Sequence, residues 1–190
     1  MSISPVLLEQ LQRLEPDATF VARGRSINSS GGNQYFGKVG TVNEVEQYIG
    51  EAESLKAMAI AAPNLSPCIL AIGVSDHGRP YFLSEYKELT ALTSEMAGIL
   101  GRRLATELHE HSSSNGFGFG VPTYCGATRL ENGWFKTWEE CYDSMIKDLL
   151  TQLERKGGYS DLCRKGNEVR QMSVRVFGGS RLYLCYLHRS

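Results

Sequence analysis

The amino-acid sequence predicts an α+β protein, in which a small antiparallel sheet with one helix on a face is followed by a mainly helical part. Residues 18–86 carry the patterns of a hairpin, a helix and a second hairpin in that order, which is typical of such a sheet. Beyond residue 90, apolar residues recur mostly at helical spacing. The chain of 190 residues is 42% hydrophobic and 22% charged, so it can bury a core without a disulfide or a structural metal.

The first helix and the first hairpin are predicted within the first 40 residues. Ser4 followed by Pro5 is typical of a helix start, and the leucines that follow fall on one face. Two strands are expected at residues 18–22 and 34–39, because both runs contain β-branched or aromatic residues. The Ser/Gly-rich segment between them is expected to be a loop, so the two strands predict a hairpin.

A second helix and a second hairpin follow. Asn43, with Glu46 three residues later, is typical of a helix cap, and apolar residues continue from there at helical spacing to Ala59. Residues 69–74 and 80–86 are apolar runs joined by a short segment that contains Asp and Gly. These two runs predict the second hairpin.

The second half of the sequence predicts helices. An amphipathic segment runs from Met96 to Leu108 and ends at a Ser/Gly-rich connector at residues 112–116. Thr137 and Glu140 have the spacing of a capping box at the start of a further helix.

Charge and composition exclude several classes of protein. The formal net charge is −1, but residues 164–190 hold six basic residues against one acidic residue, Glu168. Because these basic residues are dispersed and no nucleic-acid-binding motif accompanies them, we expect no nucleic-acid partner. No run approaches the roughly 20 apolar residues of a membrane span and no signal-peptide pattern is found, so we expect a cytoplasmic protein without membrane contact. The five cysteines form no C-x-x-C pair, which predicts free thiols and no metal site.

A phosphate-loop spacing occurs at residues 32–38 but lacks the context of a true phosphate loop. The segment matches G-x-x-x-x-G-K, yet Val39 follows where a magnesium-binding Ser or Thr is required. Tyr35 and Phe36 lie inside it, and such residues favour a strand over the glycine loop and helix start that cradle a phosphate. Lys38 is therefore the informative residue of this segment.

Two interpretations of Lys38 are open. A lysine in a strand is most often a solvated charge at the edge of a sheet. If its ammonium instead points to the interior it needs a carboxylate partner, and the following helix offers Glu51 and Glu53. In protein-kinase-like folds a strand lysine paired with a helix glutamate holds the phosphates of ATP, and a later strand leads to a hinge that binds adenine. Residues 82–87 occupy the place of that hinge.

The residues around Lys38 carry a more specific pattern. The relevant segments are Y-F-G-K-V at residues 35–39, G-E-A-E-S-L at 50–55, F-L-S-E-Y at 82–86 and N-G-W at 132–134, followed by Trp138. Over roughly residues 18–160, this combination resembles the fructosamine and ribulosamine kinase family.

The resemblance implies a protein-kinase-like fold with a small antiparallel-sheet ATP lobe and an incomplete helical C-lobe. On this interpretation residues 1–17 form an N-terminal helix, 18–90 the ATP lobe, 91–172 the partial helical lobe, and 173–190 a divergent basic tail. The implied activity is phosphorylation, with ATP and Mg²⁺, of the 3-hydroxyl of ribulosamine or fructosamine adducts. The substrates would be glycated proteins or small ketosamines, and the outcome would be protein deglycation.

The resemblance also implies roles for individual residues. Carried over by position, Lys38 would hold the ATP phosphates and Glu51 would orient Lys38. Gly31 and Gly32 are candidates for a loop that covers the phosphates. The adenine hinge would consist of Glu85, Tyr86 and Lys87.

One family segment is not found in the 190 residues. The family's H-G-D-L-W-x-x-N motif supplies a catalytic aspartate and a metal-binding asparagine, whereas the histidine nearest the end, His188, is followed by Arg189 and Ser190. We therefore assign no catalytic or metal-binding residue and expect little phosphoryl transfer. The alternative is a non-catalytic pseudokinase, or a splice remnant with a replaced C-terminal part, that binds nucleotide or a partner.

Overall fold

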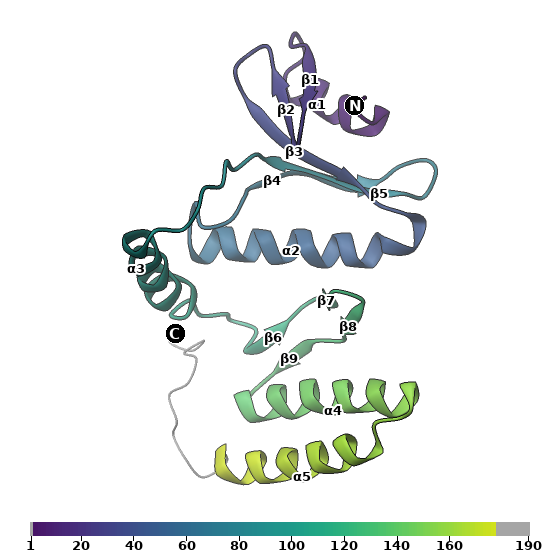
Figure 1. Cartoon of the computed structure of the whole chain (residues 1–190), viewed down its shortest axis with the longest axis vertical. Coiled ribbons are helices and arrows are strands. Elements are labelled where there is room, and N and C mark those ends of the chain that lie inside the picture. Colours follow the sequence, from purple (N-terminus) through teal and green to yellow (C-terminus); the bar gives the residue numbers. More distant parts are fainter. Residues whose placement is uncertain (1, 178–190) are drawn as a thin grey trace. The chain divides into compact units, whose positions relative to one another are not determined.

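The fold was analysed in a computed structural model, which describes residues 2–177, with side chains as far as residue 172. The chain divides into two compact units, with the boundary between Leu104 and Ala105 (Figure 1). The first unit contains a five-stranded antiparallel sheet with helices, and the second contains short strand pairs followed by two long helices. The α+β fold class predicted from the sequence is thus confirmed.

The first unit contains four helical segments and one sheet. Its elements are α1 (Pro5–Leu14), β1 (Phe20–Arg23), β2 (Ser26–Ser29), β3 (Gln34–Val39), a 3-10 turn (Val42–Glu44), α2 (Val45–Ala61), β4 (Ile69–Val74), β5 (Pro80–Glu85) and α3 (Ser94–Arg103). The strands are ordered β1-β2-β3-β5-β4, and every neighbouring pair is antiparallel. A π-helical turn, Leu104–Leu108, follows α3.

The sheet is covered on both faces, by α1 on one side and by α2 on the other (Figure 1). Successive residues of a strand point to opposite faces, and β5 illustrates the consequence. Leu83 is completely buried and joins the cluster that contains Leu11 of α1 and Ile27 of β2. Phe82 is only 2% exposed and contacts the ring of Tyr48 of α2. The core of this unit therefore lies in two layers, one on each side of β5.

The predicted first hairpin is wrong, because the segment contains three strands instead of two. The additional strand, Ser26–Ser29, lies in the segment that was expected to be a loop. It pairs with β1 across a tight turn in which Gly24 has a φ of 58°, a conformation that favours glycine. Ile27 is the only hydrophobic residue of β2 and is 7% exposed, and the other buried residue of the strand, Ser26, is polar. With so weak an apolar pattern, the sequence could not reveal this strand.

The predicted start of the second helix is also corrected. The capping box is formed by Thr41 and Glu44 and not by Asn43 and Glu46. The Glu44 carboxylate accepts hydrogen bonds from both the amide and the hydroxyl of Thr41, at 2.6 and 2.8 Å. One 3-10 turn then precedes α2, so the cap lies two residues earlier than the Asn43 pattern indicated.

Glu15, just beyond α1, fastens that helix to the sheet. Its carboxylate accepts hydrogen bonds from the Ser29 hydroxyl at 2.6 Å, from the Asn33 amide at 3.0 Å and from the Tyr35 hydroxyl. These bonds, with the one from Ser29 contributing most, hold the pKa of Glu15 below its ordinary value. Burial, followed by the neighbouring Glu15, raises the pKa of Tyr35 to about 12. The turn between β2 and β3 is thereby held against the end of α1.

The second unit contains two short antiparallel strand pairs that the sequence pattern did not predict. Strand β6 (Phe117–Phe119) pairs with β9 (Gly133–Phe135), and β7 (Thr123–Cys125) pairs with β8 (Thr128–Leu130). Each strand is three residues long, which is too short for a detectable alternation of apolar and polar residues.

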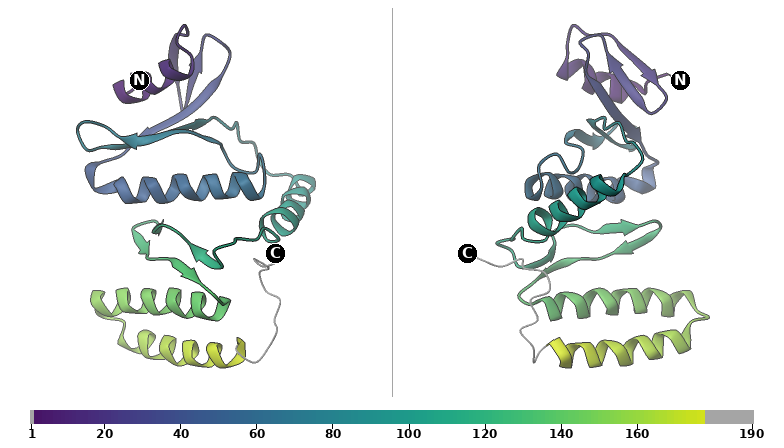
Figure 2. Two further views of the ribbon diagram at one scale, coloured as in Figure 1. Left: turned by 180° about the vertical axis from the view of Figure 1, so that it is seen from behind. Right: turned by 60° about the vertical axis from the view of Figure 1, so that its left-hand side comes forward.

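Helices α4 (Trp138–Lys156) and α5 (Ser160–Phe177) complete the second unit and lie side by side (Figure 2). The predicted capping box of Thr137 and Glu140 at the start of α4 is confirmed. Leu150 and Cys163 are buried between the helices, and Gly166 allows close approach, because a Cβ there would lie 2.6 Å from the Leu150 side chain. Of the segment expected to be a basic tail, residues 173–177 belong to α5, and residues 178–190 lie outside the described part of the chain.

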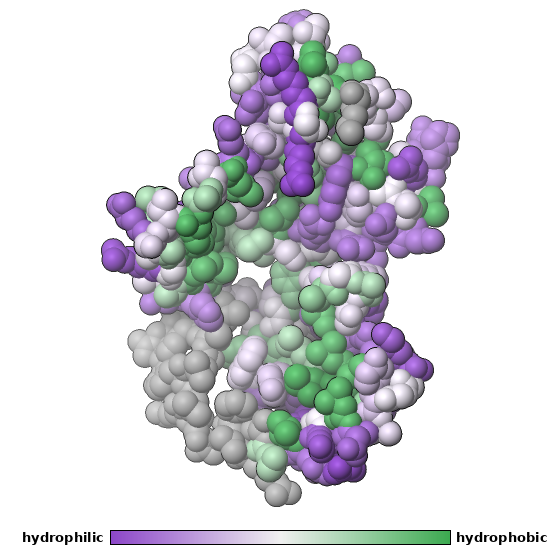
Figure 3. Space-filling model, viewed as in Figure 1, coloured by the Kyte–Doolittle hydropathy of each residue, from purple (hydrophilic) through white to green (hydrophobic). Residues whose placement is uncertain are grey.

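Apolar side chains gather on the exposed surface of α3, where the space-filling view shows a group of hydrophobic residues (Figure 3). Met96 and Ile99 of this helix are each 46% exposed, and Leu92, just before it, is 63% exposed. Among the helices within residues 2–177, none is both long and apolar enough to cross a bilayer.

Replacement of Leu83 by alanine tests the packing of β5. We expect Leu83→Ala to lower the free energy of unfolding by about 3 kcal/mol, because it leaves a cavity at a fully buried position. Leu89→Ala is the matched control, since Leu89 is 87% exposed and its loss should change stability by less than about 0.5 kcal/mol. Urea denaturation of both variants measures the difference, and equal effects would show that β5 is not the centre of the core.

Alkaline denaturation tests the contact between Tyr35 and Glu15. A raised pKa in the folded state means that stability is fully present below the ordinary value of 10.0 and is lost as the pH rises toward about 12. We expect Tyr35→Phe to lose less stability than the wild type over this range, since the variant has no phenol to ionise. The control Tyr159→Phe, at a ring that is 41% exposed, should retain the wild-type pH dependence. Parallel curves for wild type and Tyr35→Phe would refute the assignment.

Candidate functional site

The structure brings Lys38 of β3 and Glu51 of α2 into direct contact. The Lys38 Nζ atom lies 2.5 Å from Glu51 Oε2, and the two side chains are 32% and 39% exposed. Lys38 points to the face of the sheet that α2 covers, and Glu51 lies two turns into that helix. The interpretation of Lys38 as a solvated charge at a sheet edge is therefore wrong, because β3 is an internal strand and the ammonium is paired.

Two aromatic rings complete the surroundings of the Lys38 ammonium. The Nζ atom lies 4.5 Å from the centroid of the Tyr48 ring and 4.7 Å from that of Phe82. Phe82 is the residue directly opposite Lys38 in the ladder between β3 and β5, and Tyr48 comes from the first turns of α2. Neither ring was assigned a role from the sequence, although Phe82 begins the segment at residues 82–86 and Tyr48 lies two residues before the segment at 50–55.

Carboxylates determine the electrostatics around this cation. Hydrogen bonds from the backbone and side chain of Thr41 hold the pKa of Glu44 below its ordinary value, and the charge of Lys38 contributes a smaller part. Burial raises the pKa of Tyr48, and the charges of Glu44 and Glu51 raise it further. Lys38 thus faces one bonded carboxylate, Glu51, and one more distant carboxylate, Glu44.

The proposed hinge begins at the end of β5. The ladder pairs Lys38 with Phe82 and Tyr35 with Glu85, so Glu85 lies three residues, or roughly 10 Å, along the sheet from the lysine. The Glu85 carboxylate contacts Lys87 Nζ at 2.6 Å and accepts a hydrogen bond from the Cys68 amide at 3.1 Å. These interactions, with Lys87 contributing most, hold the pKa of Glu85 below its ordinary value.

Backbone hydrogen bonds fix the first two hinge residues. The amide of Glu85 donates to the carbonyl of Cys68, and the amide of Tyr86 donates to the carbonyl of Gln34, both at 3.1 Å. Within the part of the chain that the structure describes, the amide of Lys87 has no such bond to the protein. The Lys87 amide is therefore available to a ligand, whereas the amides of Glu85 and Tyr86 are already engaged.

Gly31 and Gly32 are not brought to Lys38. They lie in the turn between β2 and β3, at the other end of β3 from the lysine. A Cβ on Gly31 would lie 2.5 Å from the Glu15 carboxylate, so this glycine allows the turn to pack against Glu15. Gly32 has a φ of 91°, which favours glycine for the turn itself. Both glycines thus have a local structural role.

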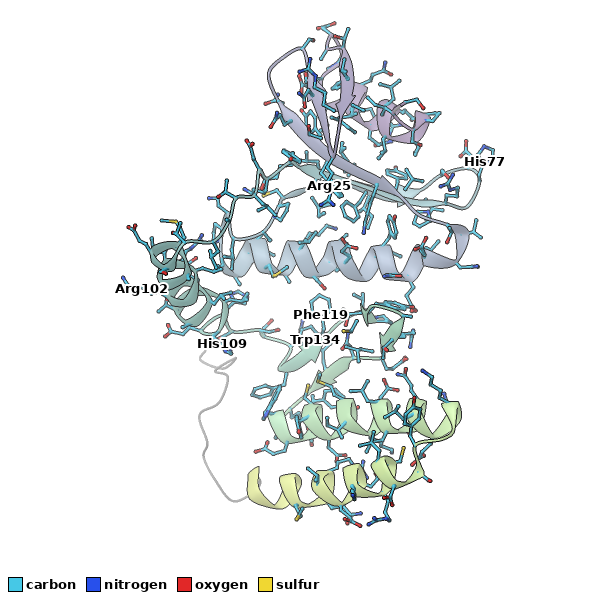
Figure 4. The ribbon with its side chains drawn as sticks, viewed as in Figure 1. Arg25, His77, Arg102, His109, Phe119 and Trp134 are labelled. Carbon is cyan, nitrogen blue, oxygen red and sulfur yellow. The ribbon has the colours of Figure 1, made fainter. Side chains whose placement is uncertain are left out.

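A different turn lies at the Lys38 end of β3. Continuing the β2–β3 register beyond the pair of Ile27 and Tyr35 places Arg25 opposite Gly37 and Gly24 opposite Lys38. Gly24 and Arg25 form the turn between β1 and β2, and Arg25 is exposed there (Figure 4). This turn could not be predicted from the sequence, because β2 has no recognisable apolar pattern. The sequence feature that could have indicated the turn is the glycine in the polar segment R-G-R-S at residues 23–26.

The second unit holds a separate pocket of about 260 Å³ between the β6–β9 strand pair and α4. The pocket is lined by four aromatic side chains, those of Phe117, Phe119, Phe135 and Trp138. The carboxylates of Glu131 and Asp148 also line it. Trp138 contacts the rings of Phe117 and Tyr142 at 6.4 and 6.0 Å between centroids. Trp134 lies outside this lining and is 40% exposed (Figure 4).

Metal-binding side chains are not clustered in residues 2–177. The described residues contain no group of three or more His, Cys, Asp or Glu side chains that could hold a metal ion.

The fold of this chain is similar to that of solved proteins described as candidate fructosamine-3-kinases. The protein from Haemophilus somnus 129PT matches with a TM-score of 0.67 and 19% identity, over 91% of this chain and 61% of its own. The protein from Thermobifida fusca YX-ER1 matches with a TM-score of 0.67 and 17% identity, over 94% of this chain and 64% of its own. This chain therefore spans about three fifths of the length of these relatives.

Sequence comparison identifies the family. A search of curated proteins finds no significant match. The family model of fructosamine kinase matches residues 12–189, a range that extends beyond residues 18–160 and into the segment from residue 173. Because this match covers most of the sequence, the chain belongs to the fructosamine kinase family.

Proposed function

We propose that this chain contributes the nucleotide-binding part of an ATP-dependent kinase that phosphorylates the 3-hydroxyl of ribulosamine or fructosamine adducts. Membership of a kinase family implies the use of ATP. The observation that carries the proposal is the contact of Lys38 with Glu51. The strand that pairs with the lysine, β5, is also the one that ends at the proposed hinge. The substrates that we propose are glycated proteins or small ketosamines, and the reaction requires Mg²⁺.

Lys38 is proposed to bind the α- and β-phosphates of ATP. Its ammonium has three N–H donors and directs one of them to Glu51, so the others are available to phosphate oxygens. Glu51 keeps the lysine side chain extended toward the nucleotide, and hydrogen bonds between an ammonium and a phosphate are of the strong, charge-assisted type. The pair thus orients a cation without neutralising it through further carboxylate contacts.

The adenine ring is proposed to bind at residues 85–87. The Lys87 amide supplies a donor. The Glu85 carbonyl, which already accepts a hydrogen bond from the Ser84 hydroxyl at 3.1 Å, supplies an acceptor through its second lone pair. The two groups would match the adjacent acceptor and donor on the edge of adenine. The engaged amides of Glu85 and Tyr86 support this assignment, since they hold the strand end in place. The spacing of roughly 10 Å along β5 is one that an adenosine can bridge between its base and its phosphates.

The loop that covers the phosphates is proposed to be the β1–β2 turn at Gly24 and Arg25. Kinases place a glycine-containing turn over the phosphates, and the β2–β3 register, continued beyond its last pair of Ile27 and Tyr35, supports a position of this turn near Lys38. Arg25 adds a positive charge at that position. Gly31 and Gly32, which the family resemblance suggested, are better explained by the packing of their turn against Glu15.

A second candidate function is nucleotide binding without phosphoryl transfer. It is favoured by one observation, that the 190 residues contain no H-G-D-L-W-x-x-N segment. Kinases use the aspartate of such a segment to accept the proton of the substrate hydroxyl. The two candidates share the same ATP site and differ in whether the γ-phosphate is transferred.

Thermal denaturation with Mg-ATP tests the role of Lys38. At about 100 times the Kd, bound nucleotide should raise the Tm of the wild type by roughly 5 to 10 °C. We expect Lys38→Ala to weaken binding roughly 10- to 100-fold, through loss of charge-assisted hydrogen bonds, and to reduce the shift to less than about half.

The matched control is Lys56→Ala, because Lys56 is also a lysine paired with a glutamate, Glu53, at 2.7 Å on the surface of α2. This variant should retain the wild-type shift. Equal shifts in Lys38→Ala and the wild type, or no shift in the wild type, would refute nucleotide binding through Lys38.

A transfer assay separates the two candidate functions. With labelled ATP and fructosyl-lysine or ribulosyl-lysine, a protein that contains the complete catalytic machinery gives a labelled sugar phosphate. For the 190-residue chain alone we expect ATP binding with transfer below about one thousandth of a typical kinase turnover of 1 s⁻¹ or more, because no catalytic aspartate can be assigned. Transfer at a typical rate would eliminate the non-catalytic candidate.

A further inference from the structure

We propose that Tyr48 and Phe82 are positioning residues for Lys38, and that their rings hold its ammonium in the place where it meets the phosphates of ATP. This inference rests on the proposed nucleotide-binding function. No role was assigned to either residue from the sequence, and the inference follows from the contacts around the Lys38 Nζ atom.

The geometry is that of a cation held between two aromatic side chains. The Nζ atom lies 4.5 Å from the Tyr48 centroid and 4.7 Å from the Phe82 centroid, both within the range of about 6 Å for cation–π attraction. The two ring centroids are 5.8 Å apart and the ring planes are inclined by 56°. The ammonium lies over both rings. Glu51 closes a third side at 2.5 Å.

The rings themselves are fixed by packing. Tyr48 is 7% exposed and Phe82 is 2% exposed. Tyr48 is packed against the backbone at Gly40, where an added Cβ would lie 2.7 Å from the ring. Phe82 contacts the ring of Phe36 from the other side. Because neither ring can move without disturbing the core, both can define the position of a lysine that is itself one third exposed.

Aromatic rings suit this task better than further carboxylates. A ring attracts the ammonium through its quadrupole but accepts no strong hydrogen bond, so it leaves the N–H donors of Lys38 free for a phosphate. A second carboxylate in contact would occupy a donor and cancel the charge that attracts the nucleotide. Apolar rings also displace water around Nζ, which strengthens its electrostatic interaction with an anion.

The test combines an NMR signal with nucleotide affinity. Lysine Hε protons that lie near the face of an aromatic ring resonate upfield of those in solvent, and Lys38→Ala identifies the signal by its loss. We expect an upfield Lys38 signal in the wild type. Tyr48→Phe keeps the ring and should retain the signal, whereas Tyr48→Met fills a similar volume without a ring and should move it toward the ordinary position.

Affinity for Mg-ATP should follow the signal. We expect Tyr48→Met to raise the Kd roughly two- to fivefold and Tyr48→Phe to leave it unchanged. Phe82→Met serves as a second variant if Tyr48→Met fails to fold. Leu11→Ala is the control for lost stability, because Leu11 packs against the opposite face of the sheet. It should alter neither the Lys38 signal nor the Kd at a temperature where the variant is folded.

The outcomes distinguish this inference from the proposed function. An ordinary Lys38 signal in the wild type overturns the positioning role, whether or not ATP binds. A signal that is lost in Tyr48→Met with an unchanged Kd also overturns it, because the rings would then not matter for binding. If the wild type binds no Mg-ATP, the proposed function is refuted. An upfield Lys38 signal that depends on Tyr48 would then support only the contact between the ring and the ammonium.

Discussion

The contact between Lys38 and Glu51 is the interaction on which the candidate site of the first unit depends. Lys38 points to the sheet face that α2 covers, and an ammonium in such a place is tolerated only when it has a partner. With both side chains about one third exposed, the pair contributes modest stability, and its main effect is on orientation. Since the lysine belongs to β3 and the glutamate to α2, the contact orients the cation between the two elements, where Tyr48 lies beside it.

Those parts of the molecule that have strong local patterns could be predicted from the sequence. The start of α1 at Pro5, the second hairpin and the capping box of Thr137 and Glu140 all follow from residue types at short spacing. The sequence left two interpretations of Lys38 open, a solvated charge at a sheet edge and an ammonium paired with a carboxylate of the following helix. The contact with Glu51 agrees with the second interpretation. A lysine in a strand can reach only a few carboxylates of the helix that follows. The sequence therefore limited the partners of Lys38 to Glu51 and Glu53.

Features that depend on weak patterns or on strand register could not be predicted. Strand β2 has one buried apolar residue, Ile27, so its pattern does not differ from that of a loop. Without β2, the turn at Gly24 could not be placed beside Lys38, and the glycines nearer in sequence were chosen instead. Phe82 lies opposite Lys38 only because of the β3–β5 register, which links residues more than 40 positions apart. The short strands of the second unit were missed because three residues do not establish a period.

A crystal structure with Mg²⁺ and a non-hydrolysable ATP analogue tests the central claim most directly. We expect a phosphate oxygen within about 3 Å of Lys38 Nζ while the contact with Glu51 is retained. We also expect the edge of adenine to lie against the backbone of Glu85 and Lys87. An analogue bound elsewhere in the molecule, or bound at the hinge with no phosphate within hydrogen-bond distance of Lys38, would contradict the account.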